Sequence, residues 1–304
     1  MQSKVFSNEP SKTRVLVTAA AGDTGRPTVE RLLEKGFKVR AFVRKDDARA
    51  QNLRNLGAEI FLGDMSSLRD VRQATSGVQR AYFCCAIGAG LVENAVIFAQ
   101  AAKEHDLELI VNMSHKQSRP AARSKATQDH WLSEQIFDWS GIPSVHLRPT
   151  FFAEWLLYAS GIIRYGRYIM PFNKDSRFAP IAAADIAKIV ANIMEKPEPY
   201  IGKALQLHGP VEYSHEELAA EVGRVLGKNL AYERVTVSVF LETLGIPQAT
   251  DLRKHFEAVA LDQEEGLIAG TDTISREIIG GPLMTVEEFI NAHRKAYELH
   301  YPLV

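Results

Sequence analysis

Short apolar runs alternate with amphipathic segments along the first half of the chain. The runs predict strands, at Val15–Thr18, Val39–Val43, Glu59–Leu62, Ala81–Cys85, Leu109–Met113 and Ser144–Arg148. The segments between them carry apolar residues three or four positions apart and predict helices, at Thr24–Lys35, Ala48–Leu56, Ser67–Thr75, Leu91–Glu104 and Lys125–Ser140. Strands that are apolar on both sides and separated by helices indicate an α/β fold, a doubly wound parallel sheet covered on both faces.

The second half of the chain has a different pattern. Thr150–Arg167 is mostly apolar and aromatic, and it is followed by a predicted helix at Ala182–Glu195 and a predicted strand at Ala204–His208. Two capping boxes, at Ser214–Glu217 and Thr285–Glu288, predict the starts of later helices. We therefore expect a smaller mixed α/β cap beside the sheet.

Composition mainly excludes classes of protein. Lys and Arg total 36 and Asp and Glu total 37, so no charge excess indicates binding to nucleic acid or to an anionic membrane. No apolar run approaches the ~20 residues of a membrane span, and the polar N-terminus lacks the apolar core of a signal peptide. The only cysteines, Cys84 and Cys85, are adjacent and poorly placed for a disulfide, which favours the reducing cytoplasm. The nine histidines lack metal-ligand spacing, so no metal is expected.

A loop rich in small residues joins the first predicted strand to the first predicted helix. Its residues are Ala19, Ala20, Ala21, Gly22, Asp23, Thr24 and Gly25. A strand, a tight turn and a helix whose free N–H groups point at a pyrophosphate are the parts of a dinucleotide site. Gly22 would let the phosphates approach the backbone, and Gly25 would let the helix pack closely on the strand. Ala19 stands where a glycine is usual, but it adds only a Cβ atom. The alternative is an ordinary strand-to-helix loop that binds nothing.

The predicted organisation follows from this loop. Residues 1–13 are expected to be a flexible lead-in, and residues 14–150 an NAD(P)-binding domain of the Rossmann type. Residues 151–304 would form the cap, a smaller substrate-binding region interleaved with the first domain.

Two cations follow the second predicted strand, where the adenosine ribose of a bound dinucleotide would lie. NAD-binding proteins place a carboxylate at this point, whereas NADP-binding proteins prefer a cation for the 2′-phosphate. Arg44 and Lys45 therefore favour NADP(H) as the cofactor. Alternatively, they are surface charges at the entrance of the next helix, which Asp46 or Asp47 could cap.

Other candidate cofactor residues follow the later strands. Asp64 could accept a hydrogen bond from the adenine amino group while Met65 packs on the ring, although Asp64 could equally be a turn or N-cap residue. Cys84 and Ala86 are small residues that would leave room near the ribose, and Pro149 ends the sixth strand.

Several motifs together resemble the NmrA-like family of atypical short-chain dehydrogenase/reductases. They are the G-x-x-G loop, Phe42-Val43-Arg44, Leu62-Gly63-Asp64, Leu147–Phe152 and Arg177–Ala187. The resemblance covers most of the chain and implies a Rossmann-type fold that binds NADP(H). Members of this family include NADPH-dependent quinone, azo-dye and triphenylmethane reductases, and also redox-sensing regulators that bind NADP without turnover.

The expected catalytic residues depart from those of typical short-chain dehydrogenases, which use a Ser and a Tyr-x-x-x-Lys helix. Ser114 stands at the serine position. The spacing to Glu134 puts His130 at the Lys position and Ala126 at the Tyr position, so the ordinary acid/base mechanism cannot operate. A His at this position resembles the quinone and triphenylmethane reductase branch, which implies that it contacts the nicotinamide ribose or a substrate oxygen. With an ordinary pKa of ~6.5, it could also donate a proton. Alternatively, His130 and Ser114 are structural.

Aromatic residues after the sixth strand are candidates for binding a flat substrate. They are Phe151, Phe152, Trp155 and Tyr158, and a helix would align three of them on one face. Alternatively, they belong to the core. Two functions remain open: an NADPH-dependent reductase of quinone-like or other conjugated molecules, and a non-catalytic NADP(H)-sensing regulator acting through a protein partner. Sugar-nucleotide chemistry is disfavoured because it depends on the absent Tyr.

Overall fold

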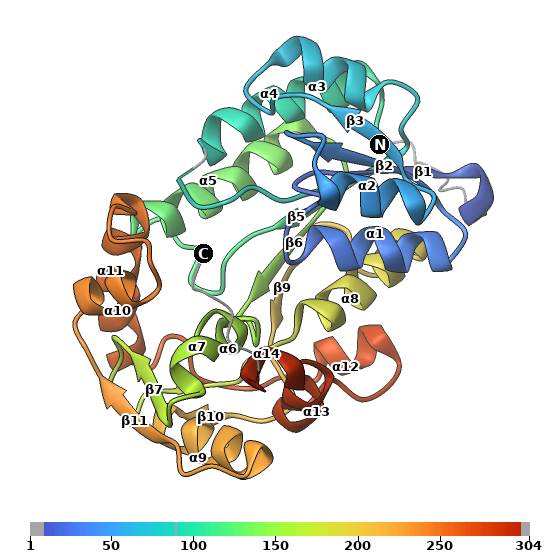
Figure 1. The fold of residues 1–304 in the computed structure, drawn as a ribbon. Coiled ribbons are helices and arrows are strands. Elements are labelled where there is room, and N and C mark those ends of the chain that lie inside the picture. Colours follow the sequence, from blue (N-terminus) through green and yellow to red (C-terminus); the bar gives the residue numbers. More distant parts are fainter. Residues whose placement is uncertain (1–8, 89, 299–304) are drawn as a thin grey trace. The chain divides into compact units, whose positions relative to one another are not determined.

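The structure is a computed structural model that describes residues 9–88 and 90–298, and its chain forms two compact units (Figure 1). The first unit extends to Pro120 and also contains Asp129–Arg148 and Ala183–Leu205. The second unit contains Ala121–Gln128, Pro149–Ala182 and the chain from Gln206 onward. The two units are therefore interleaved along the sequence. The flexible lead-in predicted for residues 1–13 lies mostly outside the described residues, and Pro10–Lys12 form a short 3-10 helix.

A seven-stranded sheet organises the first unit. Its strands are β1 (Arg14–Val17), β2 (Lys38–Val43), β3 (Glu59–Leu62), β4 (Arg80–Phe83), β5 (Leu109–Met113), β6 (Ser144–Pro149) and β9 (Ala204–Leu207). They lie in the order β3-β2-β1-β4-β5-β6-β9, and the pairs from β3 to β6 are all parallel. The order changes direction beside β1, which confirms the predicted doubly wound Rossmann-type fold. Ligands of such sheets bind at the carboxyl ends of the strands near this point.

Helices cover both faces of this sheet (Figure 1). They are α1 (Gly25–Glu34), α2 (Ala48–Asn55), α3 (Leu68–Thr75), α4 (Leu91–Glu104), α5 (Lys125–Ser140) and α8 (Ala183–Glu195). On one face α1 packs against α8, and on the other α3 packs against α4. Between the sheet and the second of these layers, Phe137 lies edge-on to both Phe83 and Phe98, so the apolar positions predicted for these helices form the core.

The predicted bounds of these elements differ from the observed ones by no more than two residues. The largest difference is at β4, which ends at Phe83 rather than Cys85. Beyond Phe83 a side chain replaces the backbone pairing of the strand. The Thr18 hydroxyl accepts a hydrogen bond from the Cys84 N–H at 2.7 Å and donates one to the Cys84 carbonyl at 2.8 Å.

The second unit consists of short elements around an aromatic core. Its strand pairs are β7 (Arg167–Met170) with β11 (Ala231–Arg234), and β8 (Arg177–Phe178) with β10 (Tyr213–Ser214). Its helices are α6 (Trp155–Tyr158), α7 (Ser160–Ile163), α9 (His215–Leu226), α10 (Val237–Thr243), α11 (Thr250–Glu264), α12 (Ile274–Ile279), α13 (Val286–Ala292) and α14 (Arg294–Glu298). The two predicted capping boxes are present at the starts of α9 and α13. In the described part of the chain, no helix is long and apolar enough to cross a membrane.

Among the buried histidines of the second unit, His215 and His255 pack against its aromatic core. The ring of His215 stacks on Phe172 at 5.3 Å, and its Nε2 contacts Gln263 Oε1 at 2.9 Å. His255 bonds the Ser124 hydroxyl through Nδ1 at 2.8 Å. Burial disfavours the charged imidazolium and lowers the pKa of each histidine to about 4.

We expect the free energy of unfolding to fall as the pH is lowered from 6.5 to about 4. In this range His215 and His255 bind protons when unfolded but remain neutral when folded, so the unfolded state gains stability. The loss is on the order of 2 kcal/mol for each histidine at pH 5. Urea unfolding at pH 7.5 and pH 5 measures it, and His215→Asn should reduce the difference. Equal unfolding free energies at the two pH values would contradict this expectation.

Candidate functional site

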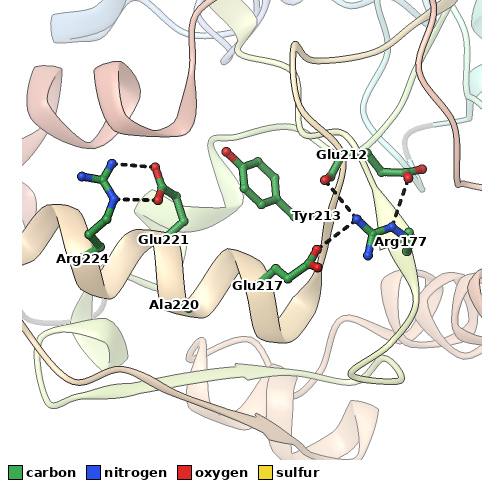
Figure 2. Close-up of a pocket in the computed structure, with 7 residues that line it drawn as sticks. All are labelled: Arg177, Glu212, Tyr213, Glu217, Ala220, Glu221 and Arg224. Carbon is green, nitrogen blue, oxygen red and sulfur yellow. Dashed lines mark hydrogen bonds and ion pairs between the residues drawn. The ribbon is translucent and has the colours of Figure 1, made fainter.

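An open hollow of about 480 Å³ on the second unit is lined largely by paired charges (Figure 2). Arg177 bonds Glu212 and Glu217, each at 3.0 Å, and Arg224 bonds Glu221 at 2.8 Å. These ion pairs are exposed and compensate one another. The hollow therefore presents no unpaired charge to recognise a ligand, and the candidate chemistry lies elsewhere, at the carboxyl ends of the parallel strands.

The loop between β1 and α1 has the tight geometry that a dinucleotide site requires. Ala19 has a φ of 47°, in the left-handed region where a glycine is favoured. A Cβ atom added to Gly25 would overlap the Ala19 carbonyl oxygen and lie 2.8 Å from Ala20 Cα. The prediction that Gly25 allows close packing is thus matched by the geometry. Ala19 adopts the turn in spite of its Cβ, at a cost of roughly 1 kcal/mol.

This loop also leaves hydrogen-bond donors available at the start of α1. Thr24 is the N-cap residue, and its side chain does not cap the helix. No described residue accepts a hydrogen bond from the backbone N–H of Thr24 or Gly25. Gly22 and Asp23 are exposed beside them, and Ala21 is half-buried. These free N–H groups and the positive end of the helix dipole fit an anionic group such as a pyrophosphate.

A buried polar cluster holds the loop in this conformation. The Tyr82 hydroxyl donates to Thr24 Oγ1 at 3.0 Å, and Thr24 Oγ1 lies 3.7 Å from the sulfur of Cys84. Burial raises the pKa of the Cys84 thiol to about 11, so it is protonated at neutral pH and is no nucleophile. Sequence reasoning missed Thr18 and Tyr82, because a threonine and a tyrosine inside strands carry no motif. Ala86, by contrast, is exposed just after β4.

The end of β2 presents two exposed cations, and the charge of Arg44 contributes to lowering the pKa of the nearby Asp64 carboxyl. Arg44 and Lys45 are exposed, and no described residue forms an ion pair or hydrogen bond with either. The neighbouring Asp47 caps α2 by accepting from the N–H groups of Arg49 and Ala50, as the sequence suggested. The helix entrance therefore has its own cap, and the two cations remain available for an anion such as a 2′-phosphate.

Asp64 has a local structural role at the end of β3. One of its carboxylate oxygens accepts from the N–H of Ser66 at 2.9 Å and from its hydroxyl at 2.8 Å. These bonds lower the pKa of Asp64, so its carboxylate is charged at neutral pH. Met65 is half-buried and packs against the core. Contact of either residue with an adenine stays a prediction.

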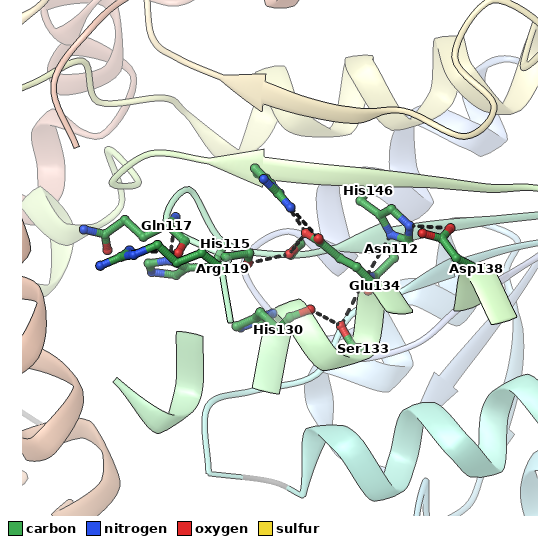
Figure 3. A network of polar contacts seen from close by, with 12 residues as sticks. Asn112, His115, Gln117, Arg119, His130, Ser133, Glu134, Asp138 and His146 are labelled. Atoms are coloured by element: carbon green, nitrogen blue, oxygen red, sulfur yellow. Dashed lines mark hydrogen bonds and ion pairs between the residues drawn. The ribbon is translucent and has the colours of Figure 1, made fainter. Parts of the chain in front are cut away.

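The predicted catalytic serine is bonded to the buried carboxylate of Glu134, which is labelled in Figure 3. Ser114 donates to the carboxylate of Glu134, which is 2% exposed, and its oxygen lies 2.8 Å from that of Ser118. Arg148 holds the same carboxylate with two hydrogen bonds of 2.8 and 2.5 Å. Ser114 is therefore engaged with Glu134, an arrangement typical of a positioning residue. In the sequence analysis, Glu134 served only to assign His130 to the Lys position.

His130 lies in α5 and is 5% exposed. Its ring stacks on that of His115, with centroids 5.8 Å apart and planes inclined by 28°. The Nδ1 of His115 accepts the N–H of Gln117 at 3.2 Å, which assigns the neutral His115 proton to Nε2. The structure thus places His115 in contact with His130, a pair that no sequence pattern predicted. Ala126, at the Tyr position, is near the start of the same helix.

The predicted aromatic residues belong to the second unit. Only Trp155 and Tyr158 are helical, in α6, so no single helix aligns Phe151 with them. The ring centroids of Phe151 and Trp155 are nevertheless 6.3 Å apart, and those of Trp155 and Tyr158 are 5.3 Å apart. Phe151 and Trp155 pack against the core, Phe152 bridges to Ile181, and Tyr158 is 45% exposed. Pro149 ends β6 just before them. Substrate binding by these residues stays a prediction.

The chain belongs to the NmrA-like family, whose model matches residues 11–290. An NAD(P)H azoreductase from Xenophilus azovorans is 27% identical over 289 residues, which cover 93% of this chain and 99% of the relative. The predicted family membership is thereby confirmed.

Solved structures have the same fold. An NADPH-dependent quinone oxidoreductase from Escherichia coli, complexed with NADPH, has a TM-score of 0.80 at 22% identity, covering 92% of this chain and 99% of its own. NmrA, a negative transcriptional regulator in complex with NADP, also has a TM-score of 0.80, at 17% identity, covering 95% of this chain and 99% of its own. A reductase and a regulator therefore share this fold.

Replacing Gly25 by Ala should destabilise the protein by about 2–4 kcal/mol, because the new Cβ overlaps the Ala19 carbonyl and forces α1 away from the loop. Urea unfolding measures the loss. Gly22→Ala is the matched control, since its Cβ would lie 3.2 Å from the same oxygen and should cost less than about 1 kcal/mol. Equal losses for the two variants would show that the close approach at Gly25 is unimportant.

Proposed function

We propose that this chain is an NADP(H)-dependent oxidoreductase that transfers hydride to a quinone-like or other conjugated small molecule. The observation that carries the proposal is the pair of free N–H groups at Thr24 and Gly25, with unpaired cations at the end of the neighbouring strand. The reductases among the relatives support it, because the chain spans nearly their whole length.

The residues present fit the cofactor. The N–H groups of Thr24 and Gly25 would hold the pyrophosphate, and Gly22 leaves its approach open. Arg44, with Lys45 beside it, would bind the 2′-phosphate, which a guanidinium can contact bidentately. When bound, NADPH supplies a hydride from its nicotinamide ring.

Few of the candidate catalytic residues can transfer a proton. Ala126 offers no phenol, and the Ser114 hydroxyl already donates a hydrogen bond to Glu134. His130 is then the residue to contact the nicotinamide ribose or a substrate oxygen, and its imidazole is the group to supply a proton. Quinones and cationic dyes accept hydride readily, so positioning can account for most of the catalysis. We assign the positioning of the acceptor to the aromatic residues Phe151, Phe152, Trp155 and Tyr158.

The second candidate function is an NADP(H)-sensing regulator that acts through a protein partner. Ala126 at the Tyr position favours it, and a regulator shares the fold. A sensor must bind NADPH and NADP⁺ with clearly different affinities, because only differential affinity shifts a conformational equilibrium. A reductase has no such requirement.

Turnover distinguishes the two functions. We expect the purified protein to oxidise NADPH in the presence of a quinone or a cationic triphenylmethane dye, followed by loss of NADPH absorbance. His130→Ala should lower kcat much more than NADPH affinity, and His130→Asn should retain activity only if His130 acts by hydrogen bonding rather than by proton transfer. Saturable NADPH binding without turnover would favour the sensor, and an unchanged kcat in His130→Ala would leave that residue a structural role.

Arg44→Ala should weaken NADPH binding by about 1.5–3 kcal/mol, the scale of a hydrogen bond to a charged group, and leave NADH binding nearly unchanged. Isothermal titration with both nucleotides measures the difference. Arg49→Ala is the matched control: Arg49 is an exposed arginine on the same segment, but its guanidinium is paired with Asp47. An equal loss of NADPH and NADH affinity in Arg44→Ala would refute the assignment.

A further inference from the structure

Gln117 is a buried glutamine whose amide group has no partner in the protein. It follows β5 in the first unit and is 4% exposed. Across residues 9–88 and 90–298, nothing forms a hydrogen bond with its Oε1 or its Nε2. A buried carboxamide without hydrogen bonds lowers the stability of the folded state. Most buried polar side chains in native proteins have a hydrogen-bond partner, so the unpaired amide calls for an explanation, and its loop carries His115, which stacks on the candidate catalytic residue His130.

The backbone of Gln117 is held in place on both sides. Its N–H donates to Nδ1 of His115 at 3.2 Å, and its carbonyl accepts from Arg119 Nη1 at 3.0 Å. The turn is closed by the Ser118 N–H, which donates to the His115 carbonyl at 3.0 Å. His115 stacks in turn on His130, so Gln117 belongs to the same polar network. In Figure 3 its side chain extends away from Glu134, so the amide does not join the buried ion pair.

We infer that Gln117 is a ligand-binding residue whose side-chain N–H₂ donates to a carbonyl group of the bound ligand. The inference rests on the proposed function and names the chemistry of its ligand. Two ligand groups could supply this carbonyl: the carboxamide of the nicotinamide ring, or a carbonyl oxygen of the acceptor. A carboxamide would satisfy both halves of the Gln117 amide, whereas a quinone oxygen would satisfy only its donor.

The first test is the stability of the protein without ligand. Gln117→Leu replaces the unpaired amide by an apolar side chain of similar volume and should raise the melting temperature by about 2–4 °C. Gln128→Leu is the matched control, because Gln128 donates to the Ala122 carbonyl at 2.8 Å and its loss should lower the melting temperature. A lower melting temperature for Gln117→Leu would overturn the inference, since the amide would then have a structural partner such as a buried water.

The second test measures ligand binding by Gln117→Leu and identifies the source of the carbonyl. Loss of one neutral hydrogen bond should weaken binding roughly 3- to 10-fold. If NADPH provides the carbonyl, the Kd for NADPH rises by this factor. If the acceptor provides it, the Kd for NADPH is unchanged, while KM rises for the quinone menadione but not for a carbonyl-free triphenylmethane dye.

The outcomes separate this inference from the proposed function. A variant with unchanged Kd for NADPH and unchanged KM for menadione would overturn the role of Gln117, whatever its stability. A wild-type protein that turns over no acceptor would contradict the proposed reductase. In that case the melting temperature and the Kd for NADPH decide the inference, and an unchanged Kd overturns it.

Discussion

The close approach of Gly25 to the Ala19 carbonyl is the constraint on which the candidate site depends. It sets the distance between the first turn of α1 and the loop after β1, so that the free N–H groups of Thr24 and Gly25 lie at the carboxyl end of the strand. β1 and β2 pair in parallel, so Arg44, which follows β2, lies at the same edge of the sheet as this turn. A bulkier residue at Gly25 would displace the helix and the donors together.

Polar side chains complete the edge of the sheet where backbone pairing stops. Thr18 bonds both backbone groups of Cys84 and thereby joins the ends of β1 and β4. Further along the edge, the buried Glu134–Arg148 pair holds Ser114. A buried carboxylate is stable only when such partners satisfy it, so this pair orders the chain after β5. The same loop carries His115 and Gln117. The backbone N–H and carbonyl of Gln117 are both hydrogen-bonded, whereas its side-chain amide is not.

The described residues thus combine a tight loop between β1 and α1 with few proton-transfer groups around Ser114 and His130. A hydride acceptor that needs little acid catalysis matches this combination, because binding and orientation then supply most of the rate. The absence of a phenol at Ala126 removes the usual base of alcohol oxidation without disturbing the helix, which runs from Lys125 to Ser140 as its apolar spacing predicts.

The sequence by itself determined the parallel sheet, its flanking helices and the tight loop between β1 and α1, because these depend on local periodicity and on glycines at fixed spacing. It also located the cations after β2 and the capping boxes. The sequence could not reveal the Tyr82–Thr24–Cys84 cluster, the His115–His130 stack or the unpaired amide of Gln117. These arise only where strands and loops distant in the sequence meet. The short strands of the second unit were likewise undetected, since two- and four-residue strands are defined by their partners and carry no period of their own.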